Sequence, residues 1–350
     1  MTATESAPSD AYVSTGSGSW TEPGAHPVAP GVTRIPLPLP MDGLRAVNVY
    51  VTETPTGLVL IDGGWAIPES RSQFESSMKE AGYALSDIRQ FLVTHMHRDH
   101  YTQAYVLGQE LGVDVSLGMG DRRTLELMHD ETIAQDPNLT RLVQAGAMHL
   151  ADKWREFLPA ERPDMSDYGM PDIWLDDDIT IDLGVRQLAA VSTPGHTQGH
   201  YVFADAENGL LFAGDHVLPT ITPSIGFEPA WVEQPLRDFM ESLRKVRALP
   251  DLQVLPAHGP TGMSSHQRVD ELLEHHEERL EACKTAVIAG ATTAWEVAGE
   301  LPWTRRNRTR DELGPFDVVL AAFETLAHLE LLALRGDVTR TEVDGEARFA

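Results

Sequence analysis

The segment at residues 95–100 places three histidines and one aspartate within six positions, in the order His-Met-His-Arg-Asp-His. Imidazole is the commonest metal ligand in proteins, and a carboxylate adds an oxygen ligand. The preceding residues, 90–94, form a short apolar and β-branched run that is typical of a buried strand. The sequence therefore predicts a metal site at the end of a strand. Its candidate ligands are His95, His97, Asp99 and His100.

Four further strand-like runs end in polar residues that could complete such a site. Each residue alone is more typical of a turn or of a satisfied polar group, but together with the first cluster they indicate one shared metal centre. A cysteine-rich structural zinc site is excluded, because Cys283 is the only cysteine in the chain. The four polar residues are Asp62, His196, Asp215 and His258.

This ordered set resembles the pattern of the metallo-β-lactamase superfamily, and the match spans about residues 31–262. The resemblance implies an α/β (α+β) fold, a four-layer αβ/βα sandwich with two divalent metal ions at one edge. Zinc is the expected metal, and iron or manganese would suit the same ligands. By resemblance, Asp215 would bridge both ions and Asp62 would orient a ligand. The first ion would be held by His95, His97 and His196, and the second by Asp99, His100 and His258.

The same resemblance implies a binuclear metal-dependent hydrolase. Bound metal can lower the pKa of water from 15.7 to about 7, so a metal-bridging hydroxide would attack the substrate without a serine or cysteine nucleophile. We expect an ester, thioester or lactone of a small, partly apolar molecule. Two alternatives stay open: a metal-dependent endoribonuclease or phosphodiesterase, and a non-hydrolytic metal-binding regulatory protein.

Three residues beside the ligands are candidates for substrate contact or for catalysis together with Asp99. They are Tyr101, His200 and His216, and packing in the core is the alternative for each. The run 101–104, Tyr-Thr-Gln-Ala, lacks the glycine that many relatives carry there.

The chain divides into three predicted regions. Residues 1–28 are rich in small and polar residues without a secretory pattern and are expected to form a flexible tail. Residues 29–263 would form the catalytic domain, in which an inserted helical segment, 119–172, would serve as a lid or as a packing interface. Residues 264–350 show two long helix-like runs, a short one and a final hairpin pattern. This order resembles the winged-helix-like extension of the β-lactamase-like protein 2 branch of the superfamily.

Charge restricts the partners. The chain carries 27 Lys and Arg against 53 Asp and Glu, a net charge of −26, which disfavours nucleic acid and favours a small-molecule substrate. One basic cluster, Arg305, Arg306, Arg308 and Arg310, is more typical of a solvated loop. We expect no membrane-spanning segment, a cytoplasmic location consistent with the lone cysteine, and a C-terminal region that serves packing or homodimer formation.

Overall fold

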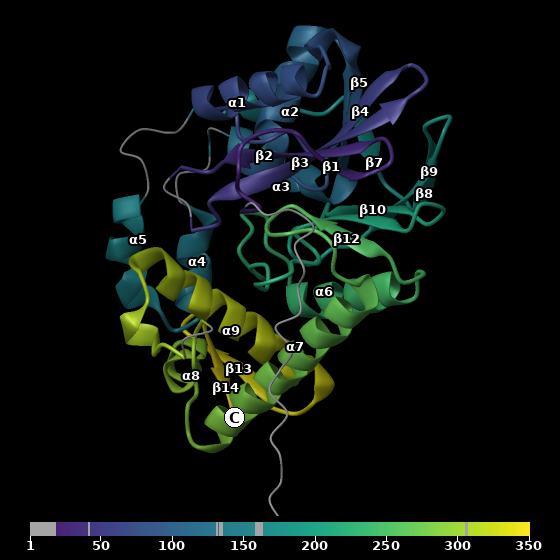
Figure 1. Cartoon of the computed structure of the whole chain (residues 1–350). Helices are drawn as coiled ribbons and strands as arrows, with labels where there is room; N and C mark the ends of the chain where they lie inside the picture. Colours follow the sequence, from purple (N-terminus) through teal and green to yellow (C-terminus); the bar gives the residue numbers. More distant parts are fainter. Residues whose placement is uncertain (1–18, 41–42, 131, 133–135, 158–163, 305–306) are drawn as a thin grey trace, which may run out of the picture.

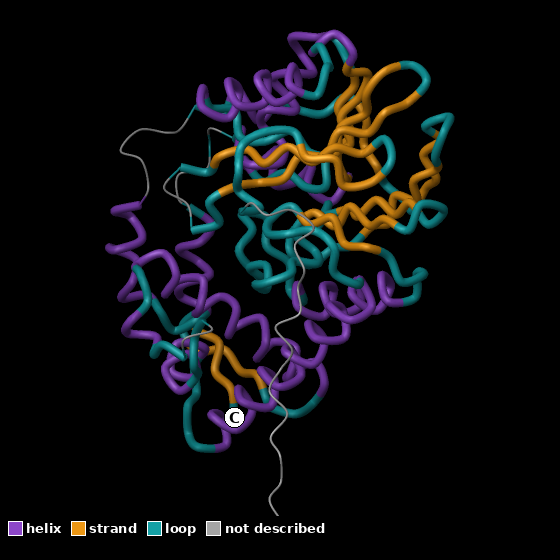
Figure 2. The backbone as a smooth tube through the Cα atoms, viewed as in Figure 1, coloured by secondary structure: helices purple, strands orange, loops and turns teal. Residues whose placement is uncertain are grey.

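The structure is a computed structural model that describes residues 19–40, 43–130, 132, 136–157, 164–304 and 307–350. Two β-sheets lie face to face, and helices cover the outer face of each sheet (Figures 1 and 2). The predicted four-layer αβ/βα arrangement is therefore confirmed.

The first sheet has seven strands in sequence order, β1 to β7. Its first four strands are antiparallel, and β4 to β7 are parallel. Ile61 pairs with Leu92, so that Asp62 emerges beside the strand that leads into the histidine cluster. The strands are β1 (His26–Ala29), β2 (Val32–Pro38), β3 (Ala46–Thr54), β4 (Gly57–Ile61), β5 (Ile88–Leu92), β6 (Asp114–Gly118) and β7 (Ile173–Leu175).

The second sheet has five strands in the order β12-β11-β10-β9-β8. Only its β11–β12 pair is parallel, and in that pair Gly214 lies opposite Pro256. Asp215 and His258 therefore leave the sheet at the same end. The strands are β8 (Ile179–Asp182), β9 (Gln187–Ser192), β10 (Tyr201–Asp205), β11 (Leu210–Gly214) and β12 (Gln253–Pro256).

Burial of apolar side chains on both faces of each sheet explains the layers. Between the sheets, the ring of Tyr50 on β3 meets the ring of Phe212 on β11 edge to face, with centroids 5.5 Å apart. On the outer face of the first sheet, α1 (Pro68–Glu80) and α2 (Arg98–Leu111) bury residues such as Phe74 and Leu107. On the outer face of the second sheet, α6 (Pro235–Arg247) buries Phe239.

The inserted segment contains η2 (Met119–Asp121), α3 (Arg122–His129), α4 (Pro137–Gln144), η3 (Met148–Leu150), α5 (Ala151–Phe157) and η4 (Ser166–Tyr168). The chain turns between α4 and η3 at Gly146, which adopts a φ of 71°. Leu142, Leu150 and Trp154 are buried in one core with the C-terminal helices. These side chains therefore pack the insertion onto the C-terminal helices, as one of the two interpretations predicted.

The C-terminal region shows the expected order of elements. It contains α7 (Ser265–Ile288), α8 (Ala294–Glu300), η5 (Arg310–Glu312), α9 (Pro315–Arg335) and the hairpin of β13 (Arg340–Val343) and β14 (Glu346–Phe349). Its apolar residues share one continuous core with the outer face of the second sheet. At the predicted boundary, residue 264, the chain changes from strands to helices, but the core continues across it. The likeness to a winged helix stays a prediction.

The expected boundary of the N-terminal tail needs correction. The predicted flexible tail includes His26, Pro27 and Val28, but these residues belong to β1, because their backbone pairs with β2. Arg305 and Arg306 of the basic cluster lie outside the described residues. Among the helices that the structure describes, none has the length and apolar character needed to cross a membrane.

Candidate metal centre

The structure brings all seven predicted ligands together at one end of the sheets. They come from four chain segments: the β5–α2 connection with the first turn of α2, the β9–β10 loop, and the ends of β11 and β12. The candidate ligand atoms within each of two groups lie within 4.8 Å of one another. The first group is His95, His97, His196 and Asp215, and the second is Asp99, His100 and His258.

Three imidazole nitrogens converge in the first group. The Nδ1 atom of His97 lies 3.0 Å from Nε2 of His95 and 3.1 Å from Nε2 of His196. Zinc–nitrogen bonds of 2.0–2.1 Å in a tetrahedral site would separate these nitrogens by about 3.3 Å. One Nδ1–H could donate to only one of the two neighbours, whereas a cation would satisfy all three lone pairs. The first group therefore fits a metal ion.

The second group contains buried polar atoms without a partner. The Nε2 atoms of His100 and His258 and the Oδ1 atom of Asp215 make no hydrogen bond among the described residues. Asp99 Oδ2 lies 3.4 Å from Nε2 of His258 and 3.6 Å from Nε2 of His100. Buried polar atoms are almost always paired, so a cation that binds all of these atoms accounts for them.

Asp215 faces both groups. Its Oδ2 atom lies 3.5 Å from Nε2 of His196, and its Oδ1 atom lies 3.3 Å from Nε2 of His258 and 3.7 Å from Nε2 of His100. One carboxylate thus presents one oxygen to each group, which is the geometry that a bridging ligand requires.

Hydrogen bonds on the far side of three of the rings direct their Nε2 atoms toward the centre. Asp62 accepts from Nδ1 of His100 at 2.9 Å and from the backbone N–H of Thr94 at 2.7 Å. The Nδ1 atom of His196 donates to the carbonyl of Ser224, and that of His258 to the carbonyl of Ala46, both at 2.8 Å. Each bond places the ring proton on Nδ1 and leaves an Nε2 lone pair for a metal.

The electrostatics of the two groups differ. Burial, reinforced by the neighbouring imidazole of His196, lowers the pKa of His97 to about 3, so this ring is neutral at neutral pH. Burial also acts to lower the pKa of His100, but the carboxylates of Asp99, Asp62 and Asp215 outweigh it and raise the pKa to about 9. The second group thus holds a proton where a cation would bind, and metal binding would release it.

His200 is packed behind the ligands. Its ring is fully buried and stacks on that of His95, with centroids 5.0 Å apart. Thr193 lies 2.8 Å from its Nδ1 atom, and its Nε2 atom accepts the backbone N–H of Asp215 at 3.2 Å. Both ring nitrogens thus have a hydrogen-bond partner within the protein. His200 therefore positions the backbone of Asp215 and has no ring nitrogen free for a substrate.

His216 and Tyr101 are also turned into the core, so neither is placed for the predicted contact with substrate. The ring of His216 is fully buried against Phe239, with centroids 5.0 Å apart. The hydroxyl of Tyr101 donates to the carbonyl of Gly169 at 2.5 Å. The run 101–104 is nevertheless helical in α2, because Gly63 lets the helix approach: a Cβ there would lie 2.4 Å from the backbone nitrogen of Ala104.

Sequence reasoning missed two buried carboxylates beside the centre. Asp121 accepts the backbone N–H groups of Met96 at 2.9 Å and of Gly199 at 2.7 Å, joining the two loops that carry the first-group histidines. Glu228 accepts from the hydroxyl of Thr124 and from the backbone N–H of Gln198. Asp121 follows a strand, as Asp62 does, so the same signal could have found it. Nothing in the sequence marks Glu228.

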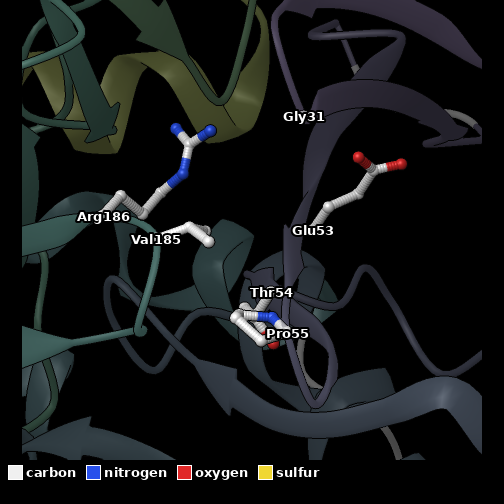
Figure 3. Close-up of a pocket in the computed structure, with 6 residues that line it drawn as sticks. All are labelled: Gly31, Glu53, Thr54, Pro55, Val185 and Arg186. Atoms are coloured by element: carbon white, nitrogen blue, oxygen red, sulfur yellow. The ribbon is translucent and has the colours of Figure 1, made fainter.

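A pocket of about 290 Å³ lies at the other end of the sheets (Figure 3). Its lining includes Thr54 and Pro55, which precede β4, whereas Asp62 follows that strand. The Arg186 guanidinium in its wall already donates to Asp205 and to the carbonyl of Pro30. The pocket is therefore separate from the metal centre.

Comparisons with known proteins agree with this geometry. A solved metallo-β-lactamase family protein from Thermus thermophilus is 28% identical, with a TM-score of 0.69, and the match covers 92% of this chain and 99% of that one. The β-lactamase-like protein 2 homolog of Caenorhabditis elegans is 30% identical over 38% of this chain and 44% of its own length. The atrochrysone carboxyl ACP thioesterase of Aspergillus fumigatus is 26% identical over 63% of this chain and 39% of its own length. The match thus spans less than half the length of either curated relative.

The family model of the metallo-β-lactamase superfamily matches residues 42–258. This range contains Asp62, both candidate metal-binding groups and most strands of the two facing sheets. The predicted family is confirmed: the chain belongs to the metallo-β-lactamase superfamily.

Proposed function

We propose that the protein is a binuclear metal-dependent hydrolase that cleaves an ester, thioester or lactone of a small molecule. The observation that carries the proposal is the position of Asp215, whose two oxygens face one group each. A centre with both groups filled gives the shared bridging position that two-metal hydrolysis uses. Zinc is the proposed metal, because imidazole and carboxylate ligands at these spacings suit it.

When bound, the two ions would activate water at neutral pH and polarise the scissile carbonyl oxygen. The chain's own residues prepare the site for that chemistry. Asp62 keeps the proton of His100 on Nδ1, and Ser224 does the same for His196. Asp99 and Asp215 supply negative charge that offsets the charge of the cations. Serine and cysteine nucleophiles are not needed, and Cys283 is buried in α7.

Two observations support an acyl substrate. One relative is named as a thioesterase of an acyl carrier protein, and thioester cleavage needs the same carbonyl polarisation. Beside the ligands, Trp65 is half-buried, and the exposed part of its ring is the aromatic surface proposed for a partly apolar acyl group. The guanidinium of Arg98 lies over the ring, 4.4 Å from its centroid. The net charge of −26 favours such a molecule over RNA.

Metal analysis together with a substrate panel tests the proposal. The panel contains acyl thioesters, aryl esters, lactones, phosphodiesters and short RNA, and the proteins are wild type, Asp99→Ala and the matched control Asp114→Ala. Asp114 is exposed at the start of β6. We expect two metal ions per chain and turnover of an acyl substrate in wild type and control. Asp99→Ala should bind one ion and lose turnover.

Fewer than two ions in metal-replete wild type would contradict the binuclear proposal. Turnover that survives Asp99→Ala undiminished would contradict the role of the second group. Cleavage of RNA or phosphodiesters without cleavage of any acyl substrate would establish the alternative, a metal-dependent nuclease.

A further inference from the structure

Residues 224–228, in the long connection between β11 and α6, join the metal centre to the C-terminal helices. The carbonyl of Ser224 accepts the Nδ1 proton of His196, as described above. Four residues later, Glu228 Oε2 accepts the backbone N–H of Gln198 at 3.2 Å. The loop that carries His196 is thus fastened twice to one short segment, on the ring and on the backbone.

The same segment is anchored in the C-terminal region. Its Phe227 ring lies 5.5 Å from the Phe316 ring and 6.2 Å from the Phe323 ring of α9, and 5.9 Å from the Trp154 ring of α5. Gly226 has a φ of 81°, and a Cβ there would lie 3.4 Å from the carbonyl oxygen of Phe323. The backbone therefore runs close along α9, which lies beside α4 and α5 (Figure 1).

Two buried carboxylates complete the connection. Glu228 Oε1 accepts the hydroxyl of Thr124 on α3 at 2.8 Å. Asp121, at the start of α3, accepts N–H groups from both first-group loops through Met96 and Gly199. The inserted segment, residues 224–228 and the loops of His95, His97 and His196 thus form one hydrogen-bonded unit.

The second group has no comparable link among the described residues. His100 is oriented by Asp62, which follows β4, and His258 by the carbonyl of Ala46, which begins β3. Both orienting groups belong to the first sheet and lie outside the core that contains α9.

We propose that residues 224–228 and Asp121 are positioning elements through which the C-terminal helix α9 sets the metal affinity of the first group and not that of the second. The inference rests on the metal centre of the proposed function, but it concerns binding and does not depend on the substrate. It assigns a role to the C-terminal helices: they hold the loop of His196 in its metal-binding position.

The hydrogen bonds predict opposite results for the same isosteric change at the two carboxylates. Both partners of Asp121 are backbone N–H donors, so Asp121→Asn places an amide NH₂ against one of them. The partners of Glu228 are one N–H and one hydroxyl, and a hydroxyl can also accept. Glu228→Gln therefore keeps both bonds, with its oxygen toward Gln198 and its NH₂ toward Thr124, whereas Glu228→Ala loses both.

Stepwise Co²⁺ titration of the full chain, followed by absorption spectroscopy and repeated as competition with Zn²⁺, measures each group separately. His97→Ala and Asp99→Ala assign the two binding steps. Phe227→Ala removes the aromatic anchor, and Ile221→Ala is the matched control, because it lies in the same connection with a side chain that is 40% exposed. Phe227→Leu provides a milder change, and circular dichroism verifies that each variant is folded.

We expect Phe227→Ala, Glu228→Ala and Asp121→Asn to weaken the first binding step by about 10- to 100-fold, the usual effect of removing a group that orients a ligand. The second step should stay within about twofold, and Glu228→Gln and Ile221→Ala should bind as wild type does. Equal weakening of both steps, or none at either, would overturn the inference. Wild type that binds no Co²⁺ or Zn²⁺ would instead refute the metal centre itself.

Discussion

The two metal-binding groups lie side by side but are built differently. The first contains three imidazoles, and burial lowers the pKa of each of them. The second combines His100 and His258 with carboxylates, which raise the pKa of both rings against the effect of burial. The first group therefore offers neutral ligands in the absence of metal, whereas the second must release protons to bind one.

The groups also differ in what supports them. The second group is oriented from strands of the first sheet, close to its own ligands. The first group is oriented by a segment that packs on α9, and this helix begins 119 residues after His196. The second group is thus supported locally, by strands that lie beside its ligands. The first group is supported remotely, by the segment that packs on α9.

Asp215→Asn breaks the comparison at the point where the two groups meet. An amide can offer one neutral oxygen to one group, but it cannot serve both as the carboxylate does. Loss of several kcal/mol of transition-state stabilisation corresponds to a decrease in kcat/KM of about 10³-fold or more. Kinetics of the purified variant should show this decrease in kcat/KM, and metal analysis should show fewer than two bound ions per chain. A variant that keeps two ions and most of its turnover would refute the bridging role.

Asp62→Asn tests the support of the second group alone. The asparagine oxygen can accept from Thr94, but the NH₂ group would then face Nδ1 of His100. The ring would have to carry its proton on Nε2, the atom that faces the metal. We expect affinity at the second group to fall by about 10- to 100-fold, with little change at the first. Co²⁺ titration measures both, and selective loss at the first group would reverse the comparison.

Much of this architecture follows from local sequence. Strands β8 and β10 form where alternating or continuous apolar residues mark a half-buried or buried strand. Each predicted ligand follows such a run, and parallel strands deliver their carboxyl ends to one edge of a sheet. The ligands could therefore be named without knowledge of any contact between them.

The direction of each neighbouring side chain could not be predicted in this way. Asp215 and His216 are adjacent in the turn that follows β11, yet the carboxylate faces the ligands and the ring faces Phe239. His200 follows His196 by four residues but stacks behind His95. Glu228 acts through Thr124, 104 positions away, and no periodicity reports a contact of that kind.

The short strands β1, β6 and β7 and the turn at Gly146 were missed for a related reason. Three to five residues contain too few periods to separate a strand from a loop, so pairing with neighbours decides them. Likewise, the apolar spacing of the inserted segment predicted burial correctly. It could not tell whether Leu142 and Trp154 would cover the metal centre or α9.

Acid pH tests the C-terminal helices that provide the remote support, because two of their histidines are buried against each other. In the C-terminal helices, Nδ1 of His276 on α7 lies 3.2 Å from Nε2 of His328 on α9, whose Nδ1 donates to the carbonyl of Glu324. Burial lowers the pKa of His328 to about 3 and that of His276 well below 6.5. The Arg279 guanidinium and the His275 ring act in the same direction on both rings, and no carboxylate offsets them.

The folded pair therefore stays neutral while the unfolded histidines, with a pKa of about 6.5, bind protons. The stabilising contribution is complete above pH 6.5, and the free energy of unfolding should fall between pH 6.5 and about pH 3, by about 1.4 kcal/mol per pH unit for each ring. Urea unfolding of chelator-treated protein from pH 7 to pH 4.5 measures this slope. His328→Gln should reduce the slope by about 1.4 kcal/mol per pH unit. The exposed control His129→Gln should keep the wild-type slope, and equal slopes in all three proteins would show that the pair is protonated in the fold.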